Sequence, residues 1–152
     1  MSRPKSRLLV LLAALLIGTG VALVPAGPAL AAGCSATGCN GKDPMAQGRS
    51  SDATTIDEFS YGDVRFELRH SSACVAVWTR VTSGHNYNTI FGQIRGYTSY
   101  PSSLSSPTAR IEGVQALQGQ QWTRMVSYSY WVRSCRAVWF DATPPVECTP
   151  VH

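Results

Sequence analysis

The feature that most constrains this chain is the regular alternation of side chains between Val64 and Val81. Apolar residues at 64, 66 and 68 alternate with charged residues at 65, 67 and 69. After two serines at 71 and 72, the segment 74–81 has apolar residues at both odd and even positions. A period of two residues is typical of β-strands, whose successive side chains point to opposite faces. The pattern predicts two strands joined by a short turn, with one wet face on the first strand. The second strand is predicted to lie centrally in a sheet, with the core built around Trp78.

Further strands are predicted at 88–97 and 108–117, with two more within 122–140. Gly92 interrupts the first of these segments and predicts a bulge or a close backbone approach, while residues 119–121 read as a turn. Residues 33–60 are rich in Gly, Ser, Thr and Asp and predict an irregular segment, with one short helical turn after Asp43. We therefore expect a mainly β protein, a small antiparallel β-sandwich or barrel with an irregular, disulfide-stapled N-terminal segment.

A short internal echo links two of these segments. Residues 74–78 and 135–139 both read C-x-A-V-W. The echo indicates either a duplicated half-domain or, more simply, two central strands with the same packing solution. Both interpretations place Trp78 and Trp139 inside the protein, because such large rings dominate local burial.

The first 31 residues have the pattern of a cleavable export signal. Three basic residues precede an apolar run at 8–24, and small residues of the A-x-A kind end it at Ala31. The sequence thus predicts a signal peptide at 1–31, a single secreted β-domain at 32–152, and no membrane span after cleavage. Cleavage removes three of the 13 basic residues, which leaves 10 against 9 acidic residues and lowers the net charge from +4 to +1. A nearly neutral domain has no electrostatic footprint for nucleic acid.

No local motif for catalysis surrounds any serine or cysteine. His70 and His85 are the only interior histidines; the first is expected at a strand end and the second in a turn. A hydrolase would need one of them beside a carboxylate and a hydroxyl. Asp43, Asp52 and Asp57 could ligate calcium, but more simply cap or close loops, and zinc is disfavoured in an oxidising compartment. The sequence predicts no catalytic residue, metal or cofactor, and leans away from an enzyme.

Aromatic residues form the most suggestive surface feature. Tyr97 and Tyr100 are expected in a loop, and Tyr128, Tyr130 and Trp131 on a strand whose exposed face could bind a ligand. Such rings stack on sugars or contact a protein partner at little cost in entropy. The simpler alternative is that they only cover the sheet. Tyr128, Tyr130 and Trp131 are the candidate binding residues, for an envelope or extracellular glycan or protein.

Four motifs resemble one known family. They are CSATGCNGKDP at 34–44, DATT at 52–55, ELRHSSACVAVWTRV at 67–81 and WTRMV at 122–126, followed by a final Cys-Thr-Pro at 148–150. Together they are similar to the actinobacterial secreted domain-of-unknown-function family 2690 across essentially the whole mature chain. The resemblance implies an exported, disulfide-bearing domain with no established activity.

The five cysteines depart from the pattern of that family. Where the family usually has a further cysteine, this chain has Arg49. The resemblance implies bridges Cys34–Cys39 and Cys135–Cys148, with Cys74 as a free, buried thiol that has lost its partner.

Three functions are therefore open from the sequence. The first is a non-enzymatic binding or interaction module at or outside the cell envelope. The second is a small exported hydrolase or enzyme inhibitor. The third is a lipoprotein anchored through Cys34, because the residues before this cysteine approximate a lipobox.

Overall fold

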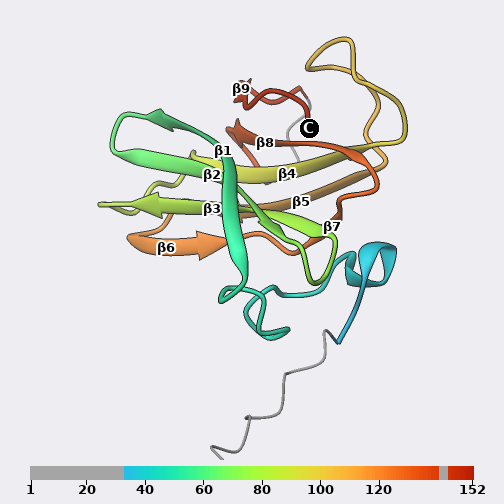
Figure 1. Cartoon of the computed structure of the whole chain (residues 1–152). Helices are drawn as coiled ribbons and strands as arrows, with labels where there is room; N and C mark the ends of the chain where they lie inside the picture. Colours follow the sequence, from blue (N-terminus) through green and yellow to red (C-terminus); the bar gives the residue numbers. More distant parts are fainter. Residues whose placement is uncertain (1–32, 141–143) are drawn as a thin grey trace, which may run out of the picture.

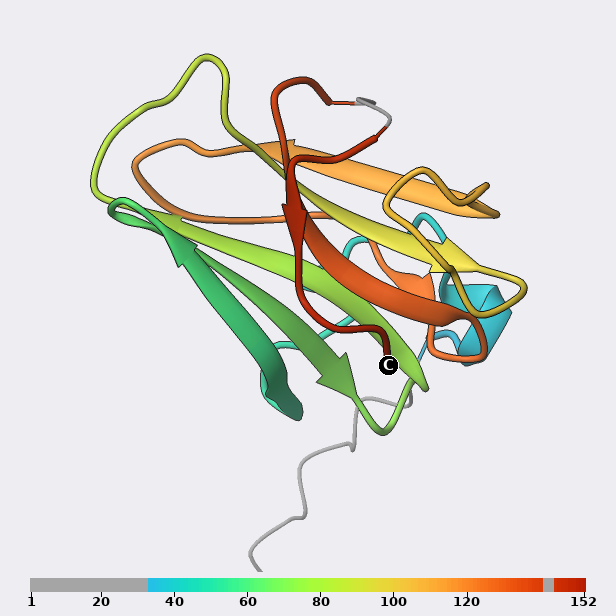
Figure 2. The same cartoon turned by 90° about the horizontal axis from the view of Figure 1, so that it is seen from above.

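A computed structural model describes residues 33–140 and 144–152, which form two antiparallel sheets packed face to face (Figures 1 and 2). In the first sheet the order is β1-β2-β3-β6, and β7 also pairs with β3; in the second it is β5-β4-β8-β9. The strands are β1 Ala53–Tyr61, β2 Val64–Ser71, β3 Ala76–Ser83, β4 Phe91–Tyr97, β5 Arg110–Gln115, β6 Gly119–Trp122, β7 Val126–Ser127, β8 Trp131–Ala137 and β9 Glu147–Cys148. The predicted mainly β, sandwich-like fold is confirmed.

The core between the sheets is formed by the alternate residues that the sequence pattern places on one face. Fully buried residues from both sheets meet there, including Leu68 and Val77 from the first sheet and Ile94 and Val132 from the second. Thr79 lies among them, and its hydroxyl donates a hydrogen bond of 2.8 Å either to the Gln93 carbonyl or to the Ser134 hydroxyl. A buried hydroxyl with such partners avoids the cost of an unsatisfied polar group.

Two glycines of β4 allow the sheets to approach closely. A Cβ at Gly92 would lie 2.3 Å from Cγ2 of Val81, and one at Gly96 would lie 2.9 Å from Cγ1 of Val126. Neither position has room for a side chain without movement of the opposite sheet. The close approach predicted at Gly92 is confirmed.

The N-terminal segment packs on the outer face of the first sheet. It contains one short 3-10 helix, η1 (Ala36–Cys39), and a series of turns that follow Asp43. The Asp43 carboxylate accepts hydrogen bonds from the backbone N–H groups of Met45 and Ala46, so its expected capping role is confirmed. We call residues 33–50 the head.

The expected burial of the two tryptophans is confirmed for Trp78 and wrong for Trp139. Trp78 is buried, but it points away from the inter-sheet core and packs with the head cysteines and Met125. Trp139 is 63% exposed, because β8 ends at Ala137 and the chain leaves the sheet before this residue is reached. The echoed motifs also sit differently: Cys74 precedes β3, whereas Cys135 lies within β8. The two motifs therefore do not mark equivalent strands.

Two other expectations were wrong in secondary structure. Residues 53–60, expected to be irregular, belong to the edge strand β1, because their backbone pairs with β2 despite a polar composition. Residues 119–121, expected to be a turn, begin β6, which pairs with β3. Pairing with a neighbouring strand overrides local propensity at both places.

The proposed signal peptide at 1–31 lies outside the described residues. Within residues 33–140 and 144–152, no helix has the length and apolar character needed to cross a membrane.

The inter-sheet contact predicts the effect of a single methyl group. Gly92→Ala is expected to lower the free energy of unfolding by about 1–3 kcal/mol, because the new Cβ overlaps the Val81 side chain. Gly38→Ala is the matched control, since no atom lies within 4 Å of its Cβ position. Urea unfolding of both variants with the disulfides intact measures the difference, and equal midpoints would contradict the packing argument.

Candidate functional site

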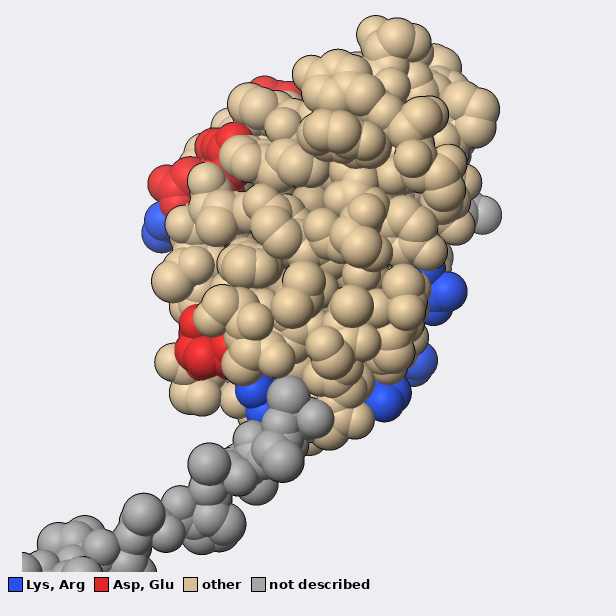
Figure 3. Space-filling view, turned by 45° about the vertical axis from the view of Figure 1, so that its right-hand side comes forward, with Lys and Arg blue, Asp and Glu red and all other residues tan. Residues whose placement is uncertain are grey.

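The three candidate binding residues Tyr128, Tyr130 and Trp131 lie together in the structure. With Ser129 and His152 they line an open groove of about 300 Å³, which we call the aromatic groove. Figure 3 shows the side of the molecule on which β7 leads into β8. On this face, charged side chains lie mainly at the margins.

The local geometry of the groove comes from a tight turn. Tyr128 and Tyr130 belong to the turn between β7 and β8, and only Trp131 is in a strand, so the expectation that all three lie on a strand was wrong. The Tyr128 N–H donates to the Val75 carbonyl at 2.9 Å, and the Tyr130 N–H donates to Ser127 at 3.3 Å. These bonds turn the chain so that successive aromatic residues line one groove, which a straight strand would not allow.

The aromatic rings of the groove differ in exposure. Trp131 is 45% exposed, and its ring is nearly perpendicular to that of Tyr100, which is 65% exposed, at 5.4 Å between centroids. Tyr128 is half-buried and packs against the ring of His70 at 4.5 Å. Burial lowers the pKa of His70, against an opposing effect of Asp52, so the imidazole in contact with Tyr128 is neutral at pH 7. Tyr97, by contrast, ends β4 and is buried.

His152 supplies the polar side of the groove. Its backbone exchanges two hydrogen bonds of 2.9 Å with Val132 of β8. Its Nε2 lies 2.9 Å from Oδ2 of Asp57 in β1, a contact across 95 residues. Sequence reasoning missed His152, and no local pattern could have found it, because the contact depends on the C-terminal segment folding back along β8.

A second, smaller cavity lies on the outer face of the first sheet. It has a volume of about 80 Å³ and is lined by Met45, Ser50, Arg69, Trp78, Arg80, Gln120 and Trp122. Beside it, the carboxylate of Glu67 is almost fully buried and accepts hydrogen bonds of 2.6 and 2.7 Å from Arg80 and one of 2.9 Å from Thr55. The expectation of a solvated charged face was therefore wrong at Glu67, because side chains of the neighbouring strands β1 and β3 cover its carboxylate.

The pKa of Glu67 reflects two opposing effects. Burial favours the neutral acid and raises the pKa, but the hydrogen bonds from Arg80 and Thr55 and the charges of Arg80 and Arg65 outweigh burial, so the net pKa is lowered. The carboxylate is therefore ionised at neutral pH and fixes the arginines of β2 and β3.

Removing this charge should destabilise the domain. Glu67→Gln is expected to cost about 3 kcal/mol, the low end for a broken buried ion pair, because Arg80 still reaches solvent. Glu58→Gln is the matched control: its carboxylate pairs with Arg65 at the surface and should cost less than about 1 kcal/mol. Thermal and urea unfolding measure both, and a Glu67 variant as stable as the control would contradict the structure.

His85 forms the nearest approach to an acid–base site. Its Nδ1 lies 2.8 Å from Oδ2 of Asp63, and the Tyr87 hydroxyl donates to the other oxygen of the same carboxylate. The His85 side chain is 76% exposed, and the nearby Ser83 hydroxyl bonds to the His85 backbone rather than to its ring. A carboxylate and a hydroxyl are present, but the histidine is open to water, and among the residues that the structure describes no serine or cysteine side chain bonds to its ring.

This cluster makes a measurable pH prediction. Hydrogen bonds from Tyr87 and then His85 lower the pKa of Asp63 to about 2. Because the folded pKa lies below the ordinary value of 3.8, the stabilisation is present above that pH and is lost as the pH falls toward 2. Carboxyl ¹³C NMR should show Asp63 titrating near 2, and higher in Tyr87→Phe. A wild-type value near 3.8 would exclude the cluster.

The aspartates considered for calcium have separate partners. Asp43 caps the head turn, Asp52 accepts from Ser71 and Ala73, and Asp57 contacts His152. Among residues 33–140 and 144–152, one group has the geometry of a metal cluster: Cys34, Cys39 and Cys74, all buried.

The cysteine pairing agrees with the one implied by the resemblance. Disulfides join Cys34 to Cys39 and Cys135 to Cys148, and Cys74 is a buried free thiol. The Cys34–Cys39 bridge argues against the lipoprotein alternative, because acylation would occupy the Cys34 sulfur that the bridge uses.

A comparison with known proteins identifies the family of the chain. Residues 37–137 match the family described as "Protein of unknown function (DUF2690)". This chain belongs to the DUF2690 family. The matched part of the DUF2690 domain runs from η1 to the end of β8 and includes Tyr128, Tyr130 and Trp131. No curated protein and no solved structure matches the chain.

Proposed function

We propose that this DUF2690 protein is a secreted, non-enzymatic binding module that acts at or outside the cell envelope, and that its ligand binds in the aromatic groove. The observation that carries the proposal is the convergence of Tyr128, Tyr130 and Trp131 with His152 on one open groove. Exposed aromatic residues that surround a concave site with a few polar groups are typical of ligand-binding sites.

The chemistry of the groove favours a glycan over a protein partner. The exposed ring of Trp131 offers an apolar face for the C–H groups of a sugar, and Ser129 and His152 line the same groove with polar groups that can bond sugar hydroxyls. The volume of about 300 Å³ is at the small end of ligand sites and suits one or two sugar residues. The residues that line the groove include no acidic side chain, lysine or arginine, which supports a neutral ligand.

Secretion is supported by the export pattern at residues 1–31 and by the two disulfides. Disulfides persist in oxidising compartments outside the cytoplasm. A glycan of the envelope or of the extracellular medium is the ligand class that such a protein would meet.

Trp131→Ala tests the proposal. Oligomers of N-acetylglucosamine, of glucose and of mannose are titrated into the ¹⁵N-labelled mature domain, and shifts of the Tyr128–Trp131 amides report binding. We expect at least one series to bind and the variant to weaken its affinity at least tenfold, because the stacking surface is lost.

Trp139→Ala is the matched control, since this tryptophan is also highly exposed but does not line the aromatic groove. Its affinity should equal that of the wild type. Equal losses in both variants, or glycan binding that leaves the Tyr128–Trp131 amides unshifted, would reject the groove as the site. Failure of all three glycan series would overturn the glycan assignment and favour a protein partner.

A further inference from the structure

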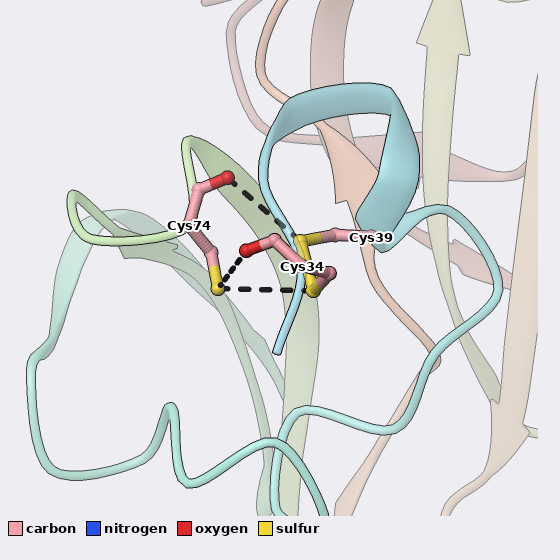
Figure 4. Close-up of side chains that lie close together, drawn as sticks. All are labelled: Cys34, Cys39 and Cys74. Atoms are coloured by element: carbon pink, nitrogen blue, oxygen red, sulfur yellow. Dashed lines mark hydrogen bonds between the residues drawn. A yellow bond between two sulfur atoms is a disulfide. The ribbon is translucent and has the colours of Figure 1, made fainter. Parts of the chain in front are cut away.

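Three buried sulfur atoms lie together where the head meets the first sheet (Figure 4). Cys34 and Cys39 form the head disulfide, and the thiol of Cys74 comes from the turn between β2 and β3. The protein therefore holds a buried free thiol, that of Cys74, beside the Cys34–Cys39 disulfide.

The distances place Cys74 next to Cys34. The two Sγ atoms are 3.9 Å apart, and the Cys74 thiol also donates to the Cys34 carbonyl at 3.3 Å. All three sulfurs lie within 4.8 Å of one another. The backbone fixes the contact as well, because the Ala36 N–H donates to the Cys74 carbonyl at 2.6 Å.

The backbone beside the cluster has an unusual conformation. Ala36 and Val75 are the non-glycine residues with positive φ in the described part of the chain, at 44° and 52°. Both lie within two residues of a cluster cysteine. A left-handed conformation is unfavourable for a β-branched valine, so the backbone is strained in the turn that carries Cys74.

We propose that the head disulfide undergoes internal exchange, in which Cys74 replaces Cys39 as the partner of Cys34. The Cys74 thiol loses its proton, and its thiolate attacks the Cys34 sulfur. The Cys34–Cys74 bond forms as the Cys34–Cys39 bond breaks, and Cys39 leaves as a thiolate that takes up a proton. One disulfide and one thiol are present before and after, so the step needs no oxidant or reductant.

Exchange requires movement of the head. Attack on a disulfide proceeds with the three sulfurs in line, whereas these sulfurs form a triangle in the resting structure. The head must therefore rotate about Cys34 before the Cys74 thiolate can attack in line with the Cys34–Cys39 bond. This movement makes the exchange slower than the short Cys34–Cys74 distance suggests.

The two forms constrain the chain differently. The Cys34–Cys39 bridge joins residues 5 apart and is local to the head. A Cys34–Cys74 bridge would join residues 40 apart and link the head covalently to the β2–β3 turn. A longer closed loop restricts the unfolded chain more strongly, so exchange converts a local staple into a link between head and sheet.

Cys39→Ser, expressed in an oxidising compartment, tests whether the Cys34–Cys74 product of the exchange can form. We expect the purified variant to form a Cys34–Cys74 disulfide, shown by peptide mapping without reduction after alkylation in acid, with no thiol left to label. Cys74→Ser is the matched control and should keep Cys34–Cys39. A folded Cys39→Ser variant with both Cys34 and Cys74 alkylated would overturn the proposal.

The wild type gives a second test that does not depend on the variant folding. The mature protein is incubated at pH 8.5, quenched in acid, unfolded and alkylated. Label that shifts in part from Cys74 to Cys39 supports exchange, whereas label on Cys74 alone at all times overturns it. The same incubation at pH 5 should slow the shift, because the thiolate is the attacking species.

Discussion

Close packing of β3 against β4 sets the spacing between the two sheets. Gly92 leaves space for Val81, and Gly96 leaves space for Val126 and for the side chain of Tyr130, whose Cβ and Cδ2 atoms lie 3.3 Å from the position of an added Cβ. Because these two glycines have no side chain, the sheets can lie close together. Gly96 also allows the β7–β8 turn to lie against β4, and this turn forms the aromatic groove.

The outer faces of both sheets are covered, which explains why so many polar residues are buried in a small domain. The head covers the first sheet, where Glu67 pairs with Arg80. On the second sheet, Arg133 donates to the Tyr97 hydroxyl and to the Ser103 carbonyl, and burial lowers the pKa of Arg95. Long side chains with several donors can satisfy backbone groups of the covering loops while their apolar stems add to the packing.

One backbone hydrogen bond connects the cysteine cluster to the aromatic groove. Val75 follows Cys74 in the β2–β3 turn, and its carbonyl accepts the Tyr128 N–H at 2.9 Å. His70, near the end of β2, contacts the Tyr128 ring. A change of cysteine pairing at this turn would act on the residue that positions Tyr128. The head and the groove are thus neighbours in the fold although they are far apart in the chain.

Local periodicity and residue type predicted the strands whose side chains alternate and the glycine contact at Gly92, and they singled out Tyr128, Tyr130 and Trp131. The sequence did not reveal the turn that brings these three residues to one groove, because that turn depends on a contact with Val75. It did not determine β1 or β6, the burial of Glu67, the exposure of Trp139 or the place of His152. Each of these depends on which segment covers which face, and that is decided by contacts between residues distant in the chain. The position of Cys74 beside the head disulfide, across 40 residues, likewise arises only when the head folds onto the sheet.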